Sequence, residues 1–207
     1  NRPTSVPPGL VFNGVLNDFY NGAWNDVMRW NQFYASNYNY YGDNQYNWTA
    51  TGLNYTTLKN VVKMEEEAKL RGLKDLNPYT ALGKFFRAYF FENVTKRVGD
   101  IPLTEALKGI ENPAAKYDTQ KDVYRQILTW LDESNYLGND LRKWQKVVNT
   151  FKLRLLISLS KKEADADLAI KQKFAEVLAN PAKFPVMESV SDNLQYTHNV
   201  NNKYPRN

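Results

Sequence analysis

Cysteine is absent from the 207-residue sequence, and histidine occurs once, at His198. The missing cysteines exclude disulfides, thiol catalysis and thiolate metal sites. A lone histidine in a polar stretch lacks the convergent partners that catalytic and metal-ligating histidines need. The HExxH, GxSxG, Walker A and GxGxxG patterns are missing as well. We therefore expect neither a metal nor a cofactor.

Long apolar runs are also missing. The longest, at 153–159, is interrupted by Arg154 and Ser158, whereas a membrane-spanning helix needs about 20 apolar residues. The first residues are polar and rich in proline, so any signal peptide or lipid-bearing cysteine is expected upstream. The net charge of +5 comes from basic residues dispersed among acidic ones. That pattern predicts a solvated surface and no nucleic-acid partner.

Apolar residues make up 43% of the chain, which is enough for one sizeable core. They recur at helical spacing in six segments, which predict helices at about 8–36, 53–71, 78–98, 120–135, 142–159 and 165–179. All nine prolines fall between these segments or at their starts, as an all-helical chain requires. The sequence thus predicts an all-α fold with irregular loops, in which residues 1–207 form one domain.

Several helix ends carry recognisable signals. Asn77 and Pro78 suit the N-cap and first position of the third helix, and Thr119 with Asp122 resembles a capping pair for the fourth. Gly72 lies where a left-handed C-terminal cap favours glycine. The fifth helix is apolar on most faces and is predicted to be the most buried.

Two helix starts resemble the tetratricopeptide spacing W-x2-L-G-x2-Y. The positions are Tyr79, Leu82, Gly83 and Phe86 in the third helix, and Trp144, Val147, Val148 and Phe151 in the fifth. Glycine at position 83 is expected where another helix presses close. The glutamates at 65–67 are interpreted as a solvent-exposed face of the second helix.

The segment 33–48 holds seven aromatic rings and four asparagines in sixteen positions. One interpretation assigns its rings to the core at the end of the first helix, namely Phe33, Tyr34, Tyr38, Tyr46 and Trp48. In the other, rings form a platform for a ligand while polar side chains bond its hydroxyls or amides. The residues of this predicted binding site are Tyr40, Tyr41, Asp43, Asn44 and Trp48. Both interpretations can hold for different rings, and residues 38–48 can form a short hairpin.

Catalysis would have to rest on carboxylates, for instance Asp100 with Glu105 or Asp132 with Glu133. Paired acids cleave glycosides only at a suitable separation, and adjacent residues on a helix point in different directions. Solvated or capping roles are therefore favoured for these residues, and no catalytic residue is predicted.

Four stretches together resemble the SusD/RagB family of nutrient-binding outer-membrane lipoproteins. They are RWNQFYASNYNYYGDNQYNW, NPYTALGKFFRAYFFENVTKRVGDIPLTEAL, KYDTQKDVYRQILTWLDES and KWQKVVNTFKLRLLISLS. The resemblance covers nearly the whole chain and implies a helical array with tetratricopeptide-like pairs. It also implies capture of glycans, or of peptides in some members, and delivery to a SusC-like TonB-dependent transporter. Members are generally not enzymes.

The chain departs from the family pattern in three ways. Members are typically more than twice as long, so the chain resembles an N-terminal portion. The stretch SNYLGNDLRKW is shorter than its usual counterpart, and the anchoring cysteine is missing. Arg97, Asp100 and Glu105 in the stretch RVGDIPLTEAL are interpreted as structural.

Three hypotheses follow from the sequence. The first is a lipid-anchored receptor on the outer-membrane surface that binds nutrient oligosaccharides, or alternatively peptides, without covalent chemistry. The second is a helical-repeat scaffold that binds another protein. The third, a glycosidase, ranks well below both.

Overall fold

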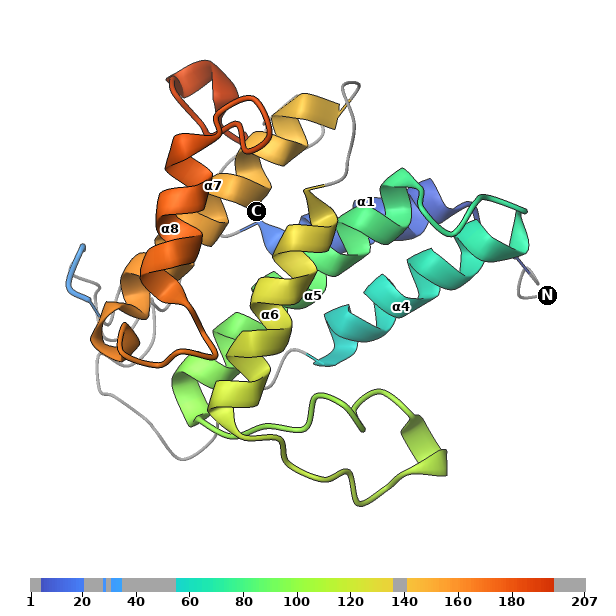
Figure 1. Ribbon diagram of the computed structural model, residues 1–207. Coiled ribbons are helices and arrows are strands. Elements are labelled where there is room, and N and C mark those ends of the chain that lie inside the picture. The colour runs from blue at the N-terminus through green and yellow to red at the C-terminus, as the bar shows by residue number, and fades with distance from the viewer. Residues whose placement is uncertain (1–4, 21–27, 29–30, 35–54, 136–140, 196–207) are drawn as a thin grey trace.

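A computed structural model shows an array of helices (Figure 1). It describes residues 5–20, 28, 31–34, 55–135 and 141–195. The α-helices are α1 (Pro8–Phe19), α4 (Tyr55–Leu70), α5 (Pro78–Val98), α6 (Gln120–Ser134), α7 (Arg142–Ser158) and α8 (Ile170–Ala179). Short 3-10 turns occur at η1 (Gly109–Glu111), η3 (Ser160–Lys162) and η4 (Val190–Asp192). The described residues contain no strand, only one bridge between Ile101 and Asp118. The all-α prediction is confirmed.

Helix α5 lies at the centre of the array, with α4 and α6 packed along it and α1 against α4. Helices α7 and α8 form a second pair beside α6 (Figure 1). More of α5 is buried than of α7. The prediction that the fifth helix is the most buried was therefore wrong, because α5 has neighbours on several sides whereas one face of α7 borders solvent.

Helix α1 begins with Pro8 in its first turn, where the missing amide costs no hydrogen bond. It ends at Phe19, because Tyr20 adopts an extended backbone with φ −70° and ψ 119°. The described residues 31–34 form a turn and a bend. The prediction of one helix over 8–36 was therefore wrong, although its apolar spacing holds along α1.

Helix α4 ends at a glycine cap, as predicted from Gly72. Gly72 has φ +73°, its amide donates to the Lys69 carbonyl, and the next amide, of Leu73, donates to the Ala68 carbonyl. These two bonds form the Schellman arrangement that closes a helix C-terminus.

The glutamate run of α4 is only partly exposed. Glu67 is 1% exposed, and its carboxylate accepts hydrogen bonds from the Ser5 hydroxyl and the Val6 amide. Lys63 pairs with it at 3.1 Å, and this partner together with those bonds holds the pKa of Glu67 below its usual value. The interpretation of 65–67 as a solvent-exposed face was thus wrong for Glu67, which ties the N-terminal segment to α4.

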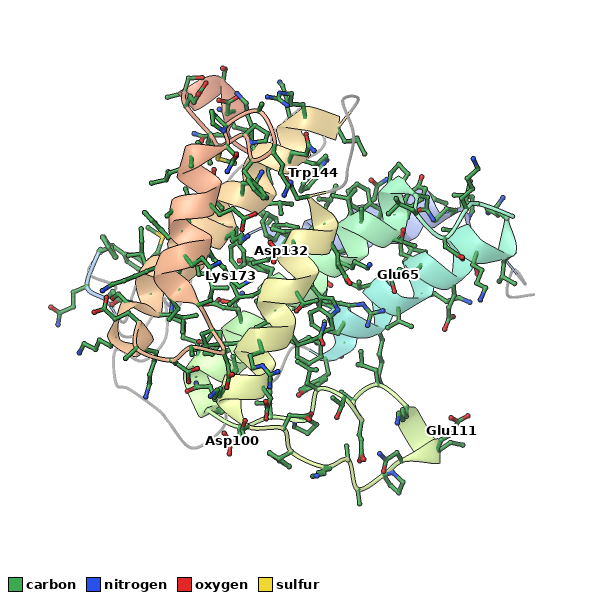
Figure 2. All side chains as sticks on the ribbon, viewed as in Figure 1. Glu65, Asp100, Glu111, Asp132, Trp144 and Lys173 are labelled. Carbon is green, nitrogen blue, oxygen red and sulfur yellow. The ribbon has the colours of Figure 1, made fainter. Side chains whose placement is uncertain are left out.

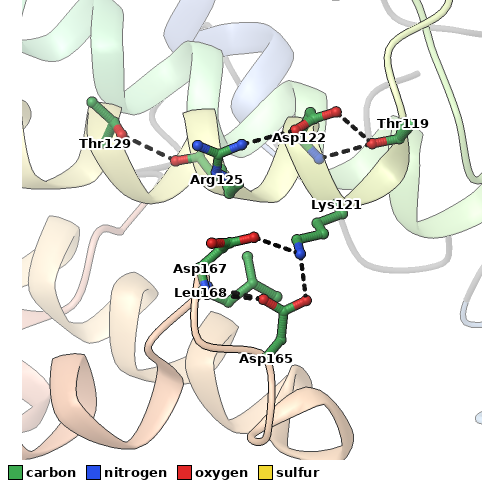
Figure 3. Close-up of polar contacts among 8 residues, drawn as sticks. All are labelled: Thr119, Lys121, Asp122, Arg125, Thr129, Asp165, Asp167 and Leu168. Carbon is green, nitrogen blue, oxygen red and sulfur yellow. Dashed lines mark hydrogen bonds and ion pairs between the residues drawn. The ribbon is translucent and has the colours of Figure 1, made fainter.

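The predicted N-caps of the next two helices are confirmed. The Asn77 side chain accepts bonds from the amides of Tyr79 and Thr80 at the start of α5. The Thr119 hydroxyl accepts from the Asp122 amide at the start of α6 and donates to the Asp122 carboxylate (Figure 3). Each cap satisfies amides that lack a partner within the helix.

Helix α8 begins at Ile170, five residues later than predicted. The Asp165 carboxylate folds the preceding turn by accepting bonds from the amides of Asp167 and Leu168. Lys121 of α6 pairs with both Asp165 and Asp167, at 2.9 and 2.7 Å (Figure 3). An aspartate that bonds to nearby amides competes with helix formation, which explains the later start.

Gly83 marks the close approach of α4 to α5. A Cβ atom at this position would lie 2.2 Å from Glu65 Oε1, and Glu65 pairs there with Arg87. The expected packing of another helix against this glycine is confirmed.

Replacing Gly83 with alanine is expected to give different results in two backgrounds. In a Glu65→Ala background, alanine should raise the free energy of unfolding by about 1 kcal/mol, the gain in helix propensity. In the wild-type background the gain should vanish, because Glu65 must move away from Arg87. Urea unfolding of the four proteins of this cycle measures the coupling. Equal effects in both backgrounds would contradict the proposed contact.

Candidate binding site

The predicted binding residues Tyr40, Tyr41, Asp43, Asn44 and Trp48 lie outside the described residues. The same holds for the hairpin over 38–48 and for His198. At the start of the segment, Phe33 is 76% exposed. Its assignment to the core was therefore wrong, and at least this ring of the segment faces solvent.

The carboxylates that a glycosidase would need are engaged in structural contacts. Asp100 accepts a bond from the Gln120 amide at the start of α6, and Glu105 accepts from the Lys116 amide. The side chain of Arg97 donates to the Asn93 carbonyl one turn earlier in α5. These contacts agree with the structural interpretation of all three residues.

The second carboxylate pair, Asp132 and Glu133, is also engaged in structural contacts. Asp132 pairs with Lys152 and Lys173, whereas Glu133 pairs with Lys84 of α5. Figure 2 labels Asp132 on α6 and Lys173 on α8. Asp132 therefore joins α6 to α7 and α8, whereas Glu133 joins it to α5, as expected for neighbouring residues that point in different directions. In the described part of the chain, no group of three or more His, Asp or Glu side chains could hold a metal ion.

A cavity of about 560 Å³ lies between α1, the start of α7 and the segment before residue 196. Its lining includes Asn13, Asn17, Phe19, Tyr20, Trp144 and Gln195. A second cavity, of about 380 Å³, continues from it between α5 and α7 and shares Phe19 and Gln195. Its lining includes Tyr89, Thr150, Phe151 and Arg154. We call the two cavities together the aromatic groove.

Aromatic rings of three helices form the floor of the aromatic groove. Phe19 of α1 packs edge-on against Phe86 of α5 and Tyr89, with ring centroids 5.5 and 4.6 Å apart. Trp144 of α7, labelled in Figure 2, packs against Phe86 at 5.9 Å and against Phe85 at 6.1 Å. Because each ring is fixed by its neighbours, the flat surfaces that face the groove are held in place before any ligand arrives.

Amide side chains border this floor. Asn13 and Asn17 lie one turn apart on the exposed face of α1, and Asn193 and Gln195 are exposed on the C-terminal segment. A primary amide offers two donors and an acceptor, which suits hydroxyl and amide groups of a ligand. The site therefore combines flat apolar faces with neutral hydrogen-bonding groups and can bind without covalent chemistry.

Asp192 fixes the C-terminal rim of the groove. Its carboxylate accepts bonds from the amides of Glu188 and Ser189 and from Lys146 Nζ of α7, at 2.9 and 3.0 Å for the lysine. The backbone bond from Glu188, followed by the contact with Lys146, lowers the pKa of Asp192 to about 2. The carboxylate is thus charged at physiological pH and anchors the turn that leads to Gln195.

Sequence reasoning missed the aromatic groove. Phe19 and Trp144 were recognised only as members of apolar helical stripes, and a stripe does not tell which of its rings border solvent. One signal was available, because Asn13 and Asn17 repeat at a spacing of four beside the apolar face of α1.

The comparisons with known proteins agree on one family. Residues 1–206 match the model of a SusD-like family described as starch-binding and associating with the outer membrane. No curated protein matches the chain. In the described residues, no helix combines the length and apolar character that crossing a membrane requires.

Three solved structures resemble the fold. Two are SusD homologs from Bacteroides fragilis NCTC 9343, with 31% and 32% identity and TM-scores of 0.75 and 0.74. The third is an outer membrane protein from Bacteroides vulgatus ATCC 8482, whose description connects it with nutrient binding, with 33% identity and a TM-score of 0.76.

These matches cover 95–97% of this chain but only 45–46% of the solved ones, so the chain spans less than half the length of those proteins. The family match over almost every residue and the shared helical fold lead to one conclusion. The chain belongs to the SusD-like family of outer-membrane nutrient-binding proteins.

Proposed function

We propose that this protein binds nutrient oligosaccharides at the cell surface and delivers them to a SusC-like TonB-dependent transporter. The aromatic groove carries the proposal, because fixed rings beside neutral amides suit the flat faces and hydroxyl groups of sugars. The family description, which names starch binding and the outer membrane, supports it. A lipid anchor upstream of this chain would hold the protein at the membrane.

The predicted segment belongs to the same proposal. The chain passes from Tyr20, which lines the groove, into the residues that precede Tyr55. We propose that Tyr40, Tyr41, Asp43, Asn44 and Trp48 add further contacts to the ligand. A Trp48→Ala variant that loses ligand while keeping its fold would support this role.

Removing a groove ring is expected to weaken glycan binding at least about tenfold, because truncating a central aromatic contact usually has a large effect. The variant is Trp144→Ala in the full-length protein, and calorimetry against a glycan panel, with a peptide panel beside it, measures the loss. Tyr117→Ala is the control, since Tyr117 is 65% exposed but lies outside the groove.

Loss of Trp144 could also disturb the core, so a second variant is needed. Asn13→Ala with Asn17→Ala removes two exposed amides and should weaken binding without changing the unfolding midpoint. If peptides bind and glycans do not, the ligand is a peptide. The proposal would be overturned if the full-length protein bound neither glycans nor peptides and did not associate with its transporter.

A further inference from the structure

The described lining of the aromatic groove carries a positive charge and no negative one. Among the described residues that line its two cavities, Arg154 carries the only charged side chain, and the others are aromatic, aliphatic, hydroxyl or amide groups. Since the described lining includes no carboxylate, it has nothing to attract a cationic ligand. A ligand with a negative charge would find one counter-charge in this lining, and the acid at the rim, Asp192, is already paired with Lys146.

Arg154 lies at the far end of the groove from Trp144. Both residues belong to one face of α7, with Val147 and Phe151 between them at steps of three, four and three. Ten residues of helix separate the two by about 15 Å along the axis. A ligand that reaches both must therefore be an extended chain with its charge away from the ring that contacts Trp144.

The guanidinium of Arg154 is available to a ligand. Its central carbon lies 4.8 Å from the centroid of the Phe151 ring, so the ring supports one face of the cation. The N–H groups at the edge of a stacked guanidinium still point outward as a planar fork. Arg87 and Arg125 form ion pairs, whereas Arg154 forms none with a described residue.

We propose that the aromatic groove takes an acidic oligosaccharide, with sugar rings against Phe19 and Trp144 and a carboxylate or sulfate group against Arg154. This inference rests on the proposed function and narrows its substrate class. A planar guanidinium matches the two oxygens of a carboxylate or sulfate through parallel hydrogen bonds, which are stronger than neutral ones. A neutral glycan would stack on the same rings but would lack this contact.

Calorimetry on the full-length protein with matched ligand pairs tests the proposal. Oligogalacturonate is compared with its methyl ester, and sulfated chondroitin oligosaccharides are compared with desulfated ones, with the carboxyls esterified in both members of this second pair. One acidic ligand is expected to bind about tenfold more tightly than its neutral partner, as a charge-assisted hydrogen bond allows. The two pairs distinguish a carboxylate from a sulfate. The preference should shrink as salt rises, because Arg154 is exposed.

Variants in α7 and η3 test whether Arg154 causes the preference for acidic ligands. Arg154→Gln should abolish it while leaving the affinity for the neutral ligands within about twofold, and Arg154→Lys should retain part of it. The control is Lys161→Gln, which removes one exposed positive charge just beyond α7 and outside the groove lining. This control should leave the preference intact, because the inference requires a local contact and not net charge.

Each outcome decides the question. A preference for an acidic ligand that Arg154→Gln removes and Lys161→Gln preserves would support the proposal. Equal affinity for acidic and neutral glycans, or a preference that Arg154→Gln does not change, would overturn it and leave the proposed function standing. Failure of every glycan to bind would overturn the proposed function as well.

Discussion

Replacing Phe86 with alanine is expected to lower the free energy of unfolding by about 4 kcal/mol, the usual range for a large aromatic residue removed from a core. The Phe86 side chain is fully buried in α5, and its ring contacts Phe12 and Phe19 of α1 and Trp144 of α7. The variant thus loses the apolar surface that joins three helices and leaves a cavity among them. Urea or thermal unfolding measures the change.

The matched control is Phe33→Ala. Phe33 is 76% exposed, so its removal should change the free energy of unfolding by less than about 0.5 kcal/mol. A loss below about 1 kcal/mol for Phe86→Ala would show that α1 and α7 are not joined through this ring. Because Trp144 rests on Phe86, the same variant should also weaken glycan binding.

The second large effect is expected for Asp132→Asn, which should lower the free energy of unfolding by about 3 kcal/mol. Asp132 of α6 contacts the ammonium of Lys152 at 2.5 Å, and the Lys152 side chain is 1% exposed. Removing one partner of a buried pair leaves the other charge without compensation, which usually costs about 3–5 kcal/mol. The lower end applies here because Asp132 is 39% exposed and water can reach it.

Two further variants separate this explanation from a simple loss of contact. Lys152→Met should cost about 1 kcal/mol or less, because Asp132 keeps Lys173 at 3.3 Å and access to water. The double variant of Asp132 and Lys152 should be more stable than Asp132→Asn alone. Denaturant unfolding of the set gives the coupling, and an additive result would exclude an uncompensated lysine as the cause.

The binding and stability predictions meet in the same part of the fold. Two of the rings that hold α1, α5 and α7 together, Phe19 and Trp144, also line the aromatic groove, and the buried ring of Phe86 packs against both of them. A site built on such packed rings keeps its shape without a ligand, which reduces the entropy lost on binding.

The helical nature of the chain and several of its boundaries followed from local patterns. Asn77, Thr119 and Gly72 act within one turn of their own helices, so their side chains or backbone angles decide a helix end without distant contacts. The spacing of apolar residues likewise identified α4, α5, α6 and α7, because a stable amphipathic helix must bury one face.

Other boundaries depended on interactions that sequence spacing cannot express. Apolar residues continue at helical spacing past Tyr20, yet the backbone extends there and α1 stops. Helix α8 starts late because Asp165 folds a turn that Lys121, forty-four positions earlier, supports through an ion pair. Glu67 looked like a solvated glutamate until the fold placed the N-terminal segment over it.

By itself, the sequence determined the helical class, the capped ends and the membership of the SusD-like family, since these are read from short-range patterns and from residue identity. The tertiary structure decided which aromatic rings border solvent and which charge stands beside them. Phe19, Trp144 and Arg154 come from distant positions, and only the packing of α1 and α7 against α5 brings them to one groove. The physical reason is that burial is a property of neighbours, and a ring in an apolar stripe becomes core or surface according to what packs against it.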